Sequence, residues 1–321
     1  MPPVPFPASR NEIEDSLLSM KLLVPVDGSP LAEQALPIAA SISTMQEVAE
    51  IRLVLVDDRN DLPAYRDSPW SKARSSMEYA YLERKARELR SIVSSPVFVE
   101  HPRGDAVDSI LAIAKEAGSD LVVMTTHGRT GFRREWVGSV ADGVMRSAGV
   151  PVLMLRSSDQ PPPAPLRPRP FSRVLIPLDG SREAETILEE AVAVAGKNAT
   201  YVLAQVVEPV PSVVPGEPFT ASTMMSDPEA TDLVARDARQ YLQEVASRLA
   251  GRGVGAVEQS VLIGDHPAQM LLDLEHTDEA IDLVALATHG RGLARLILGS
   301  VADKLLRGSR TPLLVCRRTP S

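Results

Sequence analysis

The sequence predicts two α/β domains in tandem, each a doubly wound, mostly parallel sheet of five strands. Three observations lead to this prediction. Short apolar runs alternate with amphipathic helical stretches, and strands that alternate with helices form parallel sheets. The apolar runs are continuous, as in parallel strands covered on both faces. The whole pattern then occurs a second time, and 321 residues are enough for two domains that each bury a core.

The first half begins with residues 1–19, a proline-rich and then acidic arm. An apolar strand that runs into a turn is expected within 21–30. Serine and proline at the end of that turn form a typical helix start, and 31–43 keep helical spacing despite an internal proline. The apolar run in 51–58 is the second strand. After a polar loop with two prolines, 71–93 form a long amphipathic helix.

The same alternation continues to the end of the first half. Residues 97–105 contain the third strand, and 105–117 have helical spacing. A strand beginning at residue 121 is followed by a polar, glycine-containing loop and by a helix from residue 139. The apolar run 150–155 closes the domain as its fifth strand. We therefore expect five strands in the order of a doubly wound sheet.

The domain boundaries follow from a proline-rich segment and from the repeat. Residues 157–170 are dense in proline and should form an extended, semi-rigid spacer. The pattern then starts again, so the predicted domains are 19–156 and 171–318. The copies are 152 residues apart at Asp27 and Asp179 (179 − 27 = 152) but 162 apart further on. About ten residues are therefore inserted, and we place them in the loop after the second strand.

Composition excludes several classes of protein. The net charge of −8 argues against nucleic acid as the main partner, because such binding depends on surplus Lys and Arg. The single cysteine, Cys316, excludes an internal disulfide framework and a cysteine-rich metal site, and its apolar surroundings suggest a core residue. The chain has no apolar run long enough to span a bilayer and no signal-peptide pattern at its start. We expect a cytoplasmic protein without a membrane partner.

The stretch from Leu121 to Arg146 has the pattern of a phosphate site. A buried strand leads into a glycine loop, and a helix follows. Loop glycines let the backbone approach an anion, and the free N–H groups of the first helical turn bind it at the positive end of the helix dipole. Nearly the same residues return from Leu283 onward. The sequence therefore predicts two nucleotide sites.

Acidic turns follow the first strand of each copy. Asp27 and Asp179 stand in Asp-Gly-Ser turns, and each turn opens on the same sheet edge as the glycine loop. If the first and fourth strands are neighbours, Asp27 forms one wall of a crevice and the loop the other. Its carboxylate could accept hydrogen bonds from ribose hydroxyls, or it could end the strand and cap the next helix. The aspartate in both copies favours the ligand.

The residues at the helix starts and the loop histidines can also be explained by structural roles. Ser139 to Asp142 and Ser300 to Asp303 resemble capping boxes, with Ser as N-cap and Asp three residues later. His127 is too isolated from other histidines to suggest a metal site, so we expect it to position the loop or pack on a ligand. Arginines in both loops face either polyphosphate or solvent.

Several rival motifs are excluded. A P-loop is missing, and so are a Gly-x-Ser-x-Gly elbow and the setting of a reactive cysteine. The glycines of 251–255 resemble a dinucleotide fingerprint, but they follow a helix and precede a strand, which is the wrong order. We interpret them as a helix-stop turn.

The residues in both halves resemble the universal stress protein family. The family's nucleotide-binding pattern is a glycine, two residues, a second glycine, nine residues and then Gly-Ser or Gly-Thr. In the first copy Gly128 and Gly138-Ser139 fit it, with Thr125 at the first glycine. In the second copy Gly290 and Gly299-Ser300 fit, Ala287 replaces the first glycine and the loop between is one residue shorter.

The resemblance implies a flavodoxin-like sheet of the adenine-nucleotide-hydrolase type, with strand order 3-2-1-4-5 and ATP in its crevice. It also implies that the last strands of the two repeats pair edge to edge within the chain, and it leaves room for a homodimer. In the first domain the site implied is Val26, Asp27, Leu55, Met124, His127, Gly128, Arg129, Gly138, Ser139 and Val140. In the second it is Asp179, Val206, Leu286, His289, Gly290, Gly299, Ser300 and Val301.

The function that this implies is an ATP-binding regulatory module of the stress response, with Mg²⁺ as an accompanying ion and at most slow hydrolysis. The sequence offers a phosphate cradle without an evident base, nucleophile or metal ligand set. Two alternatives stay open. One is a nucleotide-dependent enzyme on the same fold, a slow ATPase or an adenylyl-transferring relative. The other is a nucleotide-free dimerisation scaffold.

Overall fold

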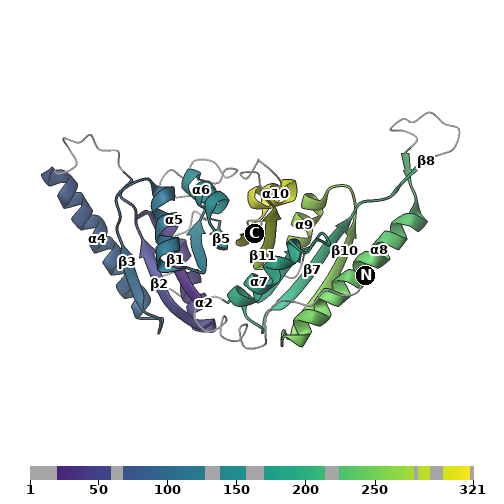
Figure 1. Cartoon of the computed structure of the whole chain (residues 1–321), viewed down its shortest axis with the longest axis horizontal. Coiled ribbons are helices and arrows are strands. Elements are labelled where there is room, and N and C mark those ends of the chain that lie inside the picture. Colours follow the sequence, from purple (N-terminus) through teal and green to yellow (C-terminus); the bar gives the residue numbers. More distant parts are fainter. Residues whose placement is uncertain are drawn as a thin grey trace. The chain divides into compact units, whose positions relative to one another are not determined.

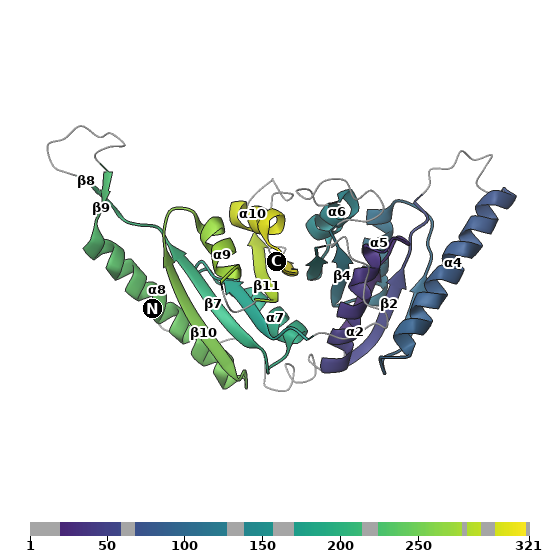
Figure 2. The same ribbon diagram turned by 180° about the vertical axis from the view of Figure 1, so that it is seen from behind.

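The computed structural model describes residues 20–58, 68–126, 138–156, 170–213, 224–277, 281–289 and 299–318. The chain divides into two compact units, 1–170 and 171–321. Each unit is an open sheet with helices packed on it, as Figure 1 shows and, from behind, Figure 2. The predicted fold class, two α/β domains in tandem with mostly parallel sheets, is confirmed.

Unit 1 has the predicted strand order. Across the described part of its sheet the strands run β5-β4-β1-β2-β3, and all neighbouring pairs are parallel. Counted along the chain this is the order 3-2-1-4-5. The elements are β1 Met20–Pro25, η1 Ala32–Gln34, α2 Ala35–Met45, β2 Val48–Val54, α4 Pro69–Arg90, β3 Val97–Glu100, α5 Ala106–Ala117, β4 Leu121–Thr125, α6 Ser139–Ser147 and β5 Val152–Leu155.

The two central strands of unit 1 form the middle of its core. Leu22, Leu23 and Val24 of β1 are completely buried, as are Val122 and Val123 of β4. Helix α2 packs on β1, β2 and β4, α4 packs on β2 and β3, and α5 and α6 pack against each other. Central strands enclosed by helices need apolar side chains on both faces, which explains the continuous apolar runs of the sequence.

Unit 2 repeats this sheet in the order β10-β7-β6-β11-β12, again with parallel neighbours. Its core follows the same rule, and Val174, Leu175 and Ile176 of its first strand are completely buried. The elements are β6 Arg173–Pro177, η2 Ala184–Thr186, α7 Ile187–Ala195, β7 Thr200–Val207, β8 Pro211–Val213, β9 Met224–Ser226, α8 Pro228–Gly251, β10 Ala256–Ile263, α9 Pro267–Glu275, β11 Leu283–His289, α10 Ser300–Gly308 and β12 Leu313–Arg318.

The predicted insertion lies mostly between the second strand and the long helix. There, β8 and β9 form an antiparallel hairpin that has no counterpart in the described residues of unit 1. The N-caps of the long helices, Ser68 and Asp227, are 159 residues apart (227 − 68 = 159). Asp27 and Asp179 are 152 apart. From the turn aspartate to the N-cap of the long helix, the second copy is therefore seven residues longer than the first (159 − 152 = 7).

Several local expectations can be compared with the structure. The Ser29 hydroxyl accepts a hydrogen bond from the amide of Ala32 at 3.1 Å, as expected of a helix start. Pro37 lies in the first turn of α2, where a missing N–H costs no intrahelical bond. Helix α8 ends at Gly251 and Gly253 follows with φ +86°, so the helix-stop turn is confirmed.

The structure corrects the expected burial of Cys316 and also bears on membrane insertion. The predicted core residue Cys316 lies in β12 as expected, but its side chain is only partly buried. Within the described ranges, none of the helices is both long enough and apolar enough to cross a bilayer.

Candidate functional site

The predicted crevice requires the first and fourth strands to be neighbours, and they are in both units. In unit 1, Leu22 of β1 pairs with Leu121 of β4. In unit 2, Leu283 of β11 pairs with Val174 of β6. Strand order reverses at these pairs, and ligands of open α/β sheets bind outside the carboxyl ends of the strands at such points. Each Asp-Gly-Ser turn therefore opens on the same edge as its glycine loop.

In unit 1, backbone hydrogen bonds hold the start of α6 beside the end of β4. The amide of Gly138 donates to the carbonyl of Thr126 at 2.6 Å, and the amide of Thr126 donates to the carbonyl of Leu155 at 2.8 Å. Residues 127–137 lie between the two ends that are joined in this way. The first turn of α6 is thus fixed at the carboxyl edge of the sheet.

The N-cap residues of α6 and α10 are glycines, which have no side chain to cap the first turn. Their N-caps are Gly138 and Gly299, and the first intrahelical bonds run from Asp142 to Gly138 and from Asp303 to Gly299, each at 2.9 Å. The earlier amides of a helix have no intrahelical acceptor. By contrast, Ser or Asp side chains cap α4, α5 and α8. Both predicted phosphate cradles therefore present uncapped amides.

The predicted capping boxes are wrong. Both helices begin one residue earlier than the pattern suggested, so Ser139 and Ser300 are the first helical residues and cannot act as N-caps. The acidic side chains pair forward along the helix instead. The Asp142 carboxylate accepts from Arg146 Nε at 2.8 Å, and the equivalent aspartate of α10 accepts from Arg307 Nε at 2.9 Å. Ser139 and Ser300 themselves are exposed.

The Asp-Gly-Ser turns have the same geometry in both units. In unit 1 the amide of Ser29 donates to Asp27 Oδ1 at 2.9 Å, and Gly28 has φ +82°, a value that favours glycine. In unit 2 the amide of Ser181 donates to Asp179 Oδ1, also at 2.9 Å. The capping role weighed for Asp27 is thus indirect, because the aspartate shapes the turn and the serine caps the helix. Its ligand role stays a prediction.

A tyrosine and a glutamate tie this turn to the long helix, and the sequence reasoning missed them. The Tyr81 hydroxyl of α4 donates to Glu33 Oε1 at 3.0 Å, and Lys85 Nζ lies 2.9 Å from Glu33 Oε2. Burial, and then the Glu33 carboxylate, raises the pKa of Tyr81. The available signal was the spacing, since each copy has a glutamate six residues after its turn aspartate (33 − 27 = 6).

Unit 2 has the matching arrangement. Burial raises the pKa of Tyr241 on α8, and the nearby Glu185 raises it further. Arg248, from the same helix, forms an ion pair with Glu185. In both units the short 3-10 helix after the turn is therefore held by the long helix.

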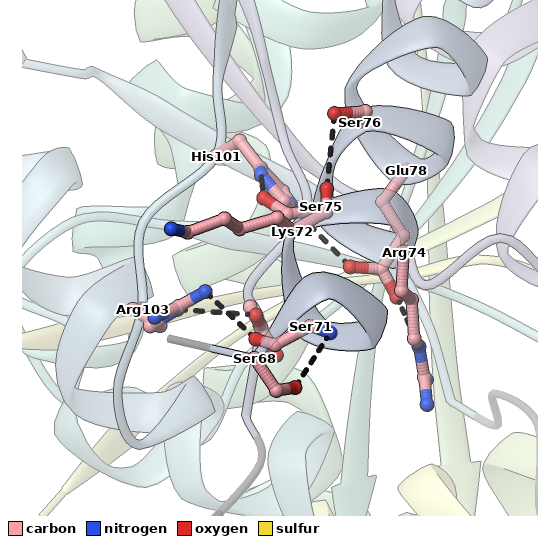
Figure 3. A network of polar contacts seen from close by, with 10 residues as sticks. Ser68, Ser71, Lys72, Arg74, Ser75, Ser76, Glu78, His101 and Arg103 are labelled. Carbon is pink, nitrogen blue, oxygen red and sulfur yellow. Dashed lines mark hydrogen bonds and ion pairs between the residues drawn. The ribbon is translucent and has the colours of Figure 1, made fainter. Parts of the chain in front are cut away.

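Unit 1 adds a polar network at the ends of β2 and β3, shown in Figure 3. Arg103 Nε lies 3.3 Å from the carboxylate of Asp57, which is 4% exposed, and Arg103 Nη2 donates to Ser71 Oγ at 3.2 Å. His101, which follows β3, contacts two residues further along α4, Ser75 at 3.5 Å and Glu78 at 3.3 Å. The network fastens the start of α4 to the strand ends. Sequence reasoning had no signal for it, because its members come from separate segments.

Most of the other predicted site residues in the described ranges are buried or half-buried near the carboxyl edge. The amide of Val26 donates to the carbonyl of Val54 at 2.8 Å, and the amide of Leu55 donates to the carbonyl of Glu100 at 3.1 Å. Both amides therefore form hydrogen bonds to neighbouring strands. Met124 and Leu286 are buried in the central strands, Val206 is half-buried in β7, and Val140 and Val301 are half-buried in the first helical turns.

Part of each predicted site lies outside the described residues. This applies to His127, Gly128 and Arg129 in the first copy and to Gly290 in the second. His289 ends β11, and only its backbone is described. Within the described ranges, His, Cys, Asp and Glu side chains form no group of three that could hold a metal ion. The described site in each unit is therefore the acidic turn and the uncapped helix start.

Known proteins are similar to this chain over both of its units. The sequence model of the universal stress protein family matches residues 19–156 and 170–317. The Mycobacterium tuberculosis universal stress protein Rv2005c is 30% identical over 221 residues, which span 66% of this chain and 66% of that protein, slightly under two thirds of its length. Rv2623, from the same organism, is 27% identical over 321 residues and covers 94% of this chain and 97% of that protein.

A solved structure shares the fold over nearly the whole chain. The crystal structure of a universal stress protein from Archaeoglobus fulgidus has a TM-score of 0.64 at 21% identity, covering 93% of this chain and 98% of that one. At this identity the likeness concerns the fold alone. The family match covers both units and most of the sequence. The chain therefore belongs to the universal stress protein family and carries two family domains in tandem.

Proposed function

We propose that this protein is an adenine-nucleotide-binding regulatory module, with one ATP site at the carboxyl edge of each sheet. The observation that carries the proposal is the pair of uncapped helix starts. Gly138 and Gly299 are the N-caps of helices at the strand-order reversal of each sheet, and as glycines they offer no side chain to the first-turn amides. Such amides, together with the helix dipole, favour a phosphate.

The acidic turn supplies the second half of the proposed site. Asp27 and Asp179 follow the neighbouring strands β1 and β6, and the serine two residues further on donates its amide to each carboxylate, with the Ser181 hydroxyl donating to Asp179 as well. A carboxylate has further lone pairs that can accept from ribose hydroxyls. Phosphates at the helix and ribose at the turn place the base over the strand ends, beside Val26 in the first unit. Mg²⁺ would accompany the polyphosphate.

The proposal assigns binding rather than turnover. The described groups at each cradle are backbone amides, one carboxylate and one serine hydroxyl, and these can orient and hold an anion. Binding would then be read out by a change of conformation or partner, with slow hydrolysis at most.

The test is the nucleotide content of freshly purified protein, followed by calorimetric titration with ATP and Mg²⁺. We expect co-purified or titratable adenine nucleotide, and weaker binding in Asp27→Ala. Asp120→Ala is the matched control, because Asp120 binds the amide of Lys21 at the opposite end of the strands. Absence of binding at millimolar ATP would refute the proposal. Metal-dependent turnover abolished by Asp27→Ala would instead favour the enzyme alternative.

A further inference from the structure

Gln205 of unit 2 has a buried polar atom without a partner at the edge of the proposed nucleotide site. The residue lies near the carboxyl end of β7, and its Oε1 is buried and accepts no hydrogen bond from the described residues. Its Nε2 lies 3.8 Å from the position that a Cβ would take at Gly180, in the turn that contains Asp179. An unpaired buried acceptor is costly, so a ligand that donates to it would remove that cost.

The two copies differ at this position. In both sheets the last residue of the first strand is a proline that pairs with a residue of the second strand. The residue that follows this partner is Leu55 in unit 1 and Gln205 in unit 2. Leu55 is buried, and its apolar side chain can form no hydrogen bond. The fold thus does not require a carboxamide at this position, and the polar group is particular to unit 2.

The order of the strands places Gln205 where the base of a nucleotide would lie. Along the carboxyl edge of unit 2 the order is β7-β6-β11. The proposed phosphate position is the start of α10, which follows β11, and the proposed ribose position is the Asp179 turn, which follows β6. A nucleotide laid along these two points extends its base toward the end of β7. The amide of Leu178 donates to the carbonyl of Ala204 at 2.8 Å, so the turn and the end of β7 are joined there.

We propose that the Gln205 carboxamide recognises the base of the nucleotide in unit 2 and selects adenine, a proposal that rests on the nucleotide site proposed above. A carboxamide has a donor and an acceptor side by side, and adenine has the complementary pair at N7 and its 6-amino group. The Gln205 side chain is half-buried, and the terminal torsion of a glutamine is broad, so the carboxamide can turn both atoms toward a base. A 6-oxo purine has no 6-amino group and would leave Oε1 unpaired.

The test compares ATP with inosine triphosphate (ITP), whose base differs from adenine at the 6-position, by calorimetric titration of the full chain in the presence of Mg²⁺. Asp27→Ala weakens the unit 1 site, so the titration of this variant reports unit 2. In this background ATP should bind about 10- to 100-fold more tightly than ITP, the value of one bidentate base contact. Adding Gln205→Leu, which supplies the residue type of unit 1, should bring the two affinities to within about threefold, because an apolar side chain discriminates little between such bases.

Two controls isolate the carboxamide. Gln259→Leu removes an exposed glutamine of the neighbouring strand β10, whose Nε2 donates to Gln243 at 2.8 Å, and it should leave the preference for ATP unchanged. In the Asp179→Ala background only unit 1 keeps its acidic turn, and there Gln205→Leu should change neither affinity. Thermal unfolding should show that Gln205→Leu is at least as stable as the wild type, because the substitution removes an unpaired buried acceptor.

The outcomes separate this proposal from the one on which it rests. If the Asp27→Ala protein binds neither nucleotide at millimolar concentration, unit 2 has no nucleotide site and both proposals fail for that unit. If it binds ATP and ITP equally well, or if Gln205→Leu keeps the full preference for ATP, the nucleotide site stands and the role of Gln205 is overturned. A preference for ATP that disappears in Gln205→Leu supports both proposals.

Discussion

Placing a carboxylate at the start of α10 should stabilise unit 2 and weaken its nucleotide binding at the same time. Gly299 is the N-cap, with φ −56° and ψ 150°, and a Cβ added there meets nothing within 4 Å. Gly299→Asp is therefore accommodated without strain. Its carboxylate would accept the uncapped amides of the first turn, the role that Asp105 and Asp227 perform on other helices of this chain.

The magnitudes follow from this geometry. An Asp N-cap improves on Gly by a few tenths of a kcal/mol, and its charge at the helix dipole adds about 0.3–1 kcal/mol. For a unit of this size a gain of about 1 kcal/mol raises the Tm by about 2–4 °C. The same carboxylate would occupy and repel the phosphate position, a loss of about 1–3 kcal/mol or about 10- to 100-fold in affinity at one of two sites.

Gly299→Ala is the matched control. Alanine fills the same open space but is a poor N-cap, so it should lower stability by about 0.5–1 kcal/mol while leaving the amides available. In Gly299→Asp, thermal unfolding should show a higher Tm while calorimetric titration shows weaker ATP binding. In Gly299→Ala, the Tm should fall while the affinity for ATP stays that of the wild type. If Gly299→Asp stabilises the protein and both of its sites keep wild-type affinity, the amides of α10 hold no phosphate.

Three further outcomes follow from particular contacts. Asp105→Ala removes the side chain that accepts from the Asp108 amide at 3.0 Å, so urea unfolding should show a loss of about 1 kcal/mol with ATP binding unchanged. In Tyr81→Phe the free energy of unfolding should fall less steeply at alkaline pH than in the wild type. Since burial raises the folded-state pKa of Tyr81, stability is full below the unfolded value of about 10 and falls as the pH rises beyond it, a slope that chemical denaturation between pH 9 and 11 measures. Glu275→Ala should cost about 1–3 kcal/mol in urea unfolding, because the buried Glu275 carboxylate accepts from the amides of Arg310 and Thr311 at 2.7 and 2.9 Å; a variant that unfolds like the wild type would show that this loop needs no such anchor.

The architecture could be predicted from local patterns because those patterns have a direct physical cause. Continuous apolar runs such as 121–124 mean strands covered on both faces, and helical spacing between them leaves parallel pairing as the only compact arrangement. The repeat and the place of the insertion follow from comparing the two halves, whereas the linker, at 157–170, lies almost wholly outside the described residues and stays a prediction. The edge of the sheet where Asp27 and Gly138 lie also follows, because parallel strands end on one side. The edge-to-edge pairing of the last strands stays a prediction.

Other features depended on contacts between distant segments. The capping boxes were wrong by a single residue, because hydrogen bonding at Gly138 and Thr126, rather than the serine, decides where α6 begins. The tyrosine–glutamate tie joins positions 48 residues apart, and the outer face of α4 is defined only once the sheet covers its other side. Sequence by itself determined which residues form strands, helices and turns, since periodicity and turn chemistry act locally. Tertiary structure alone decided which polar groups meet and which apolar ones stay exposed, since that depends on packing across the whole sheet.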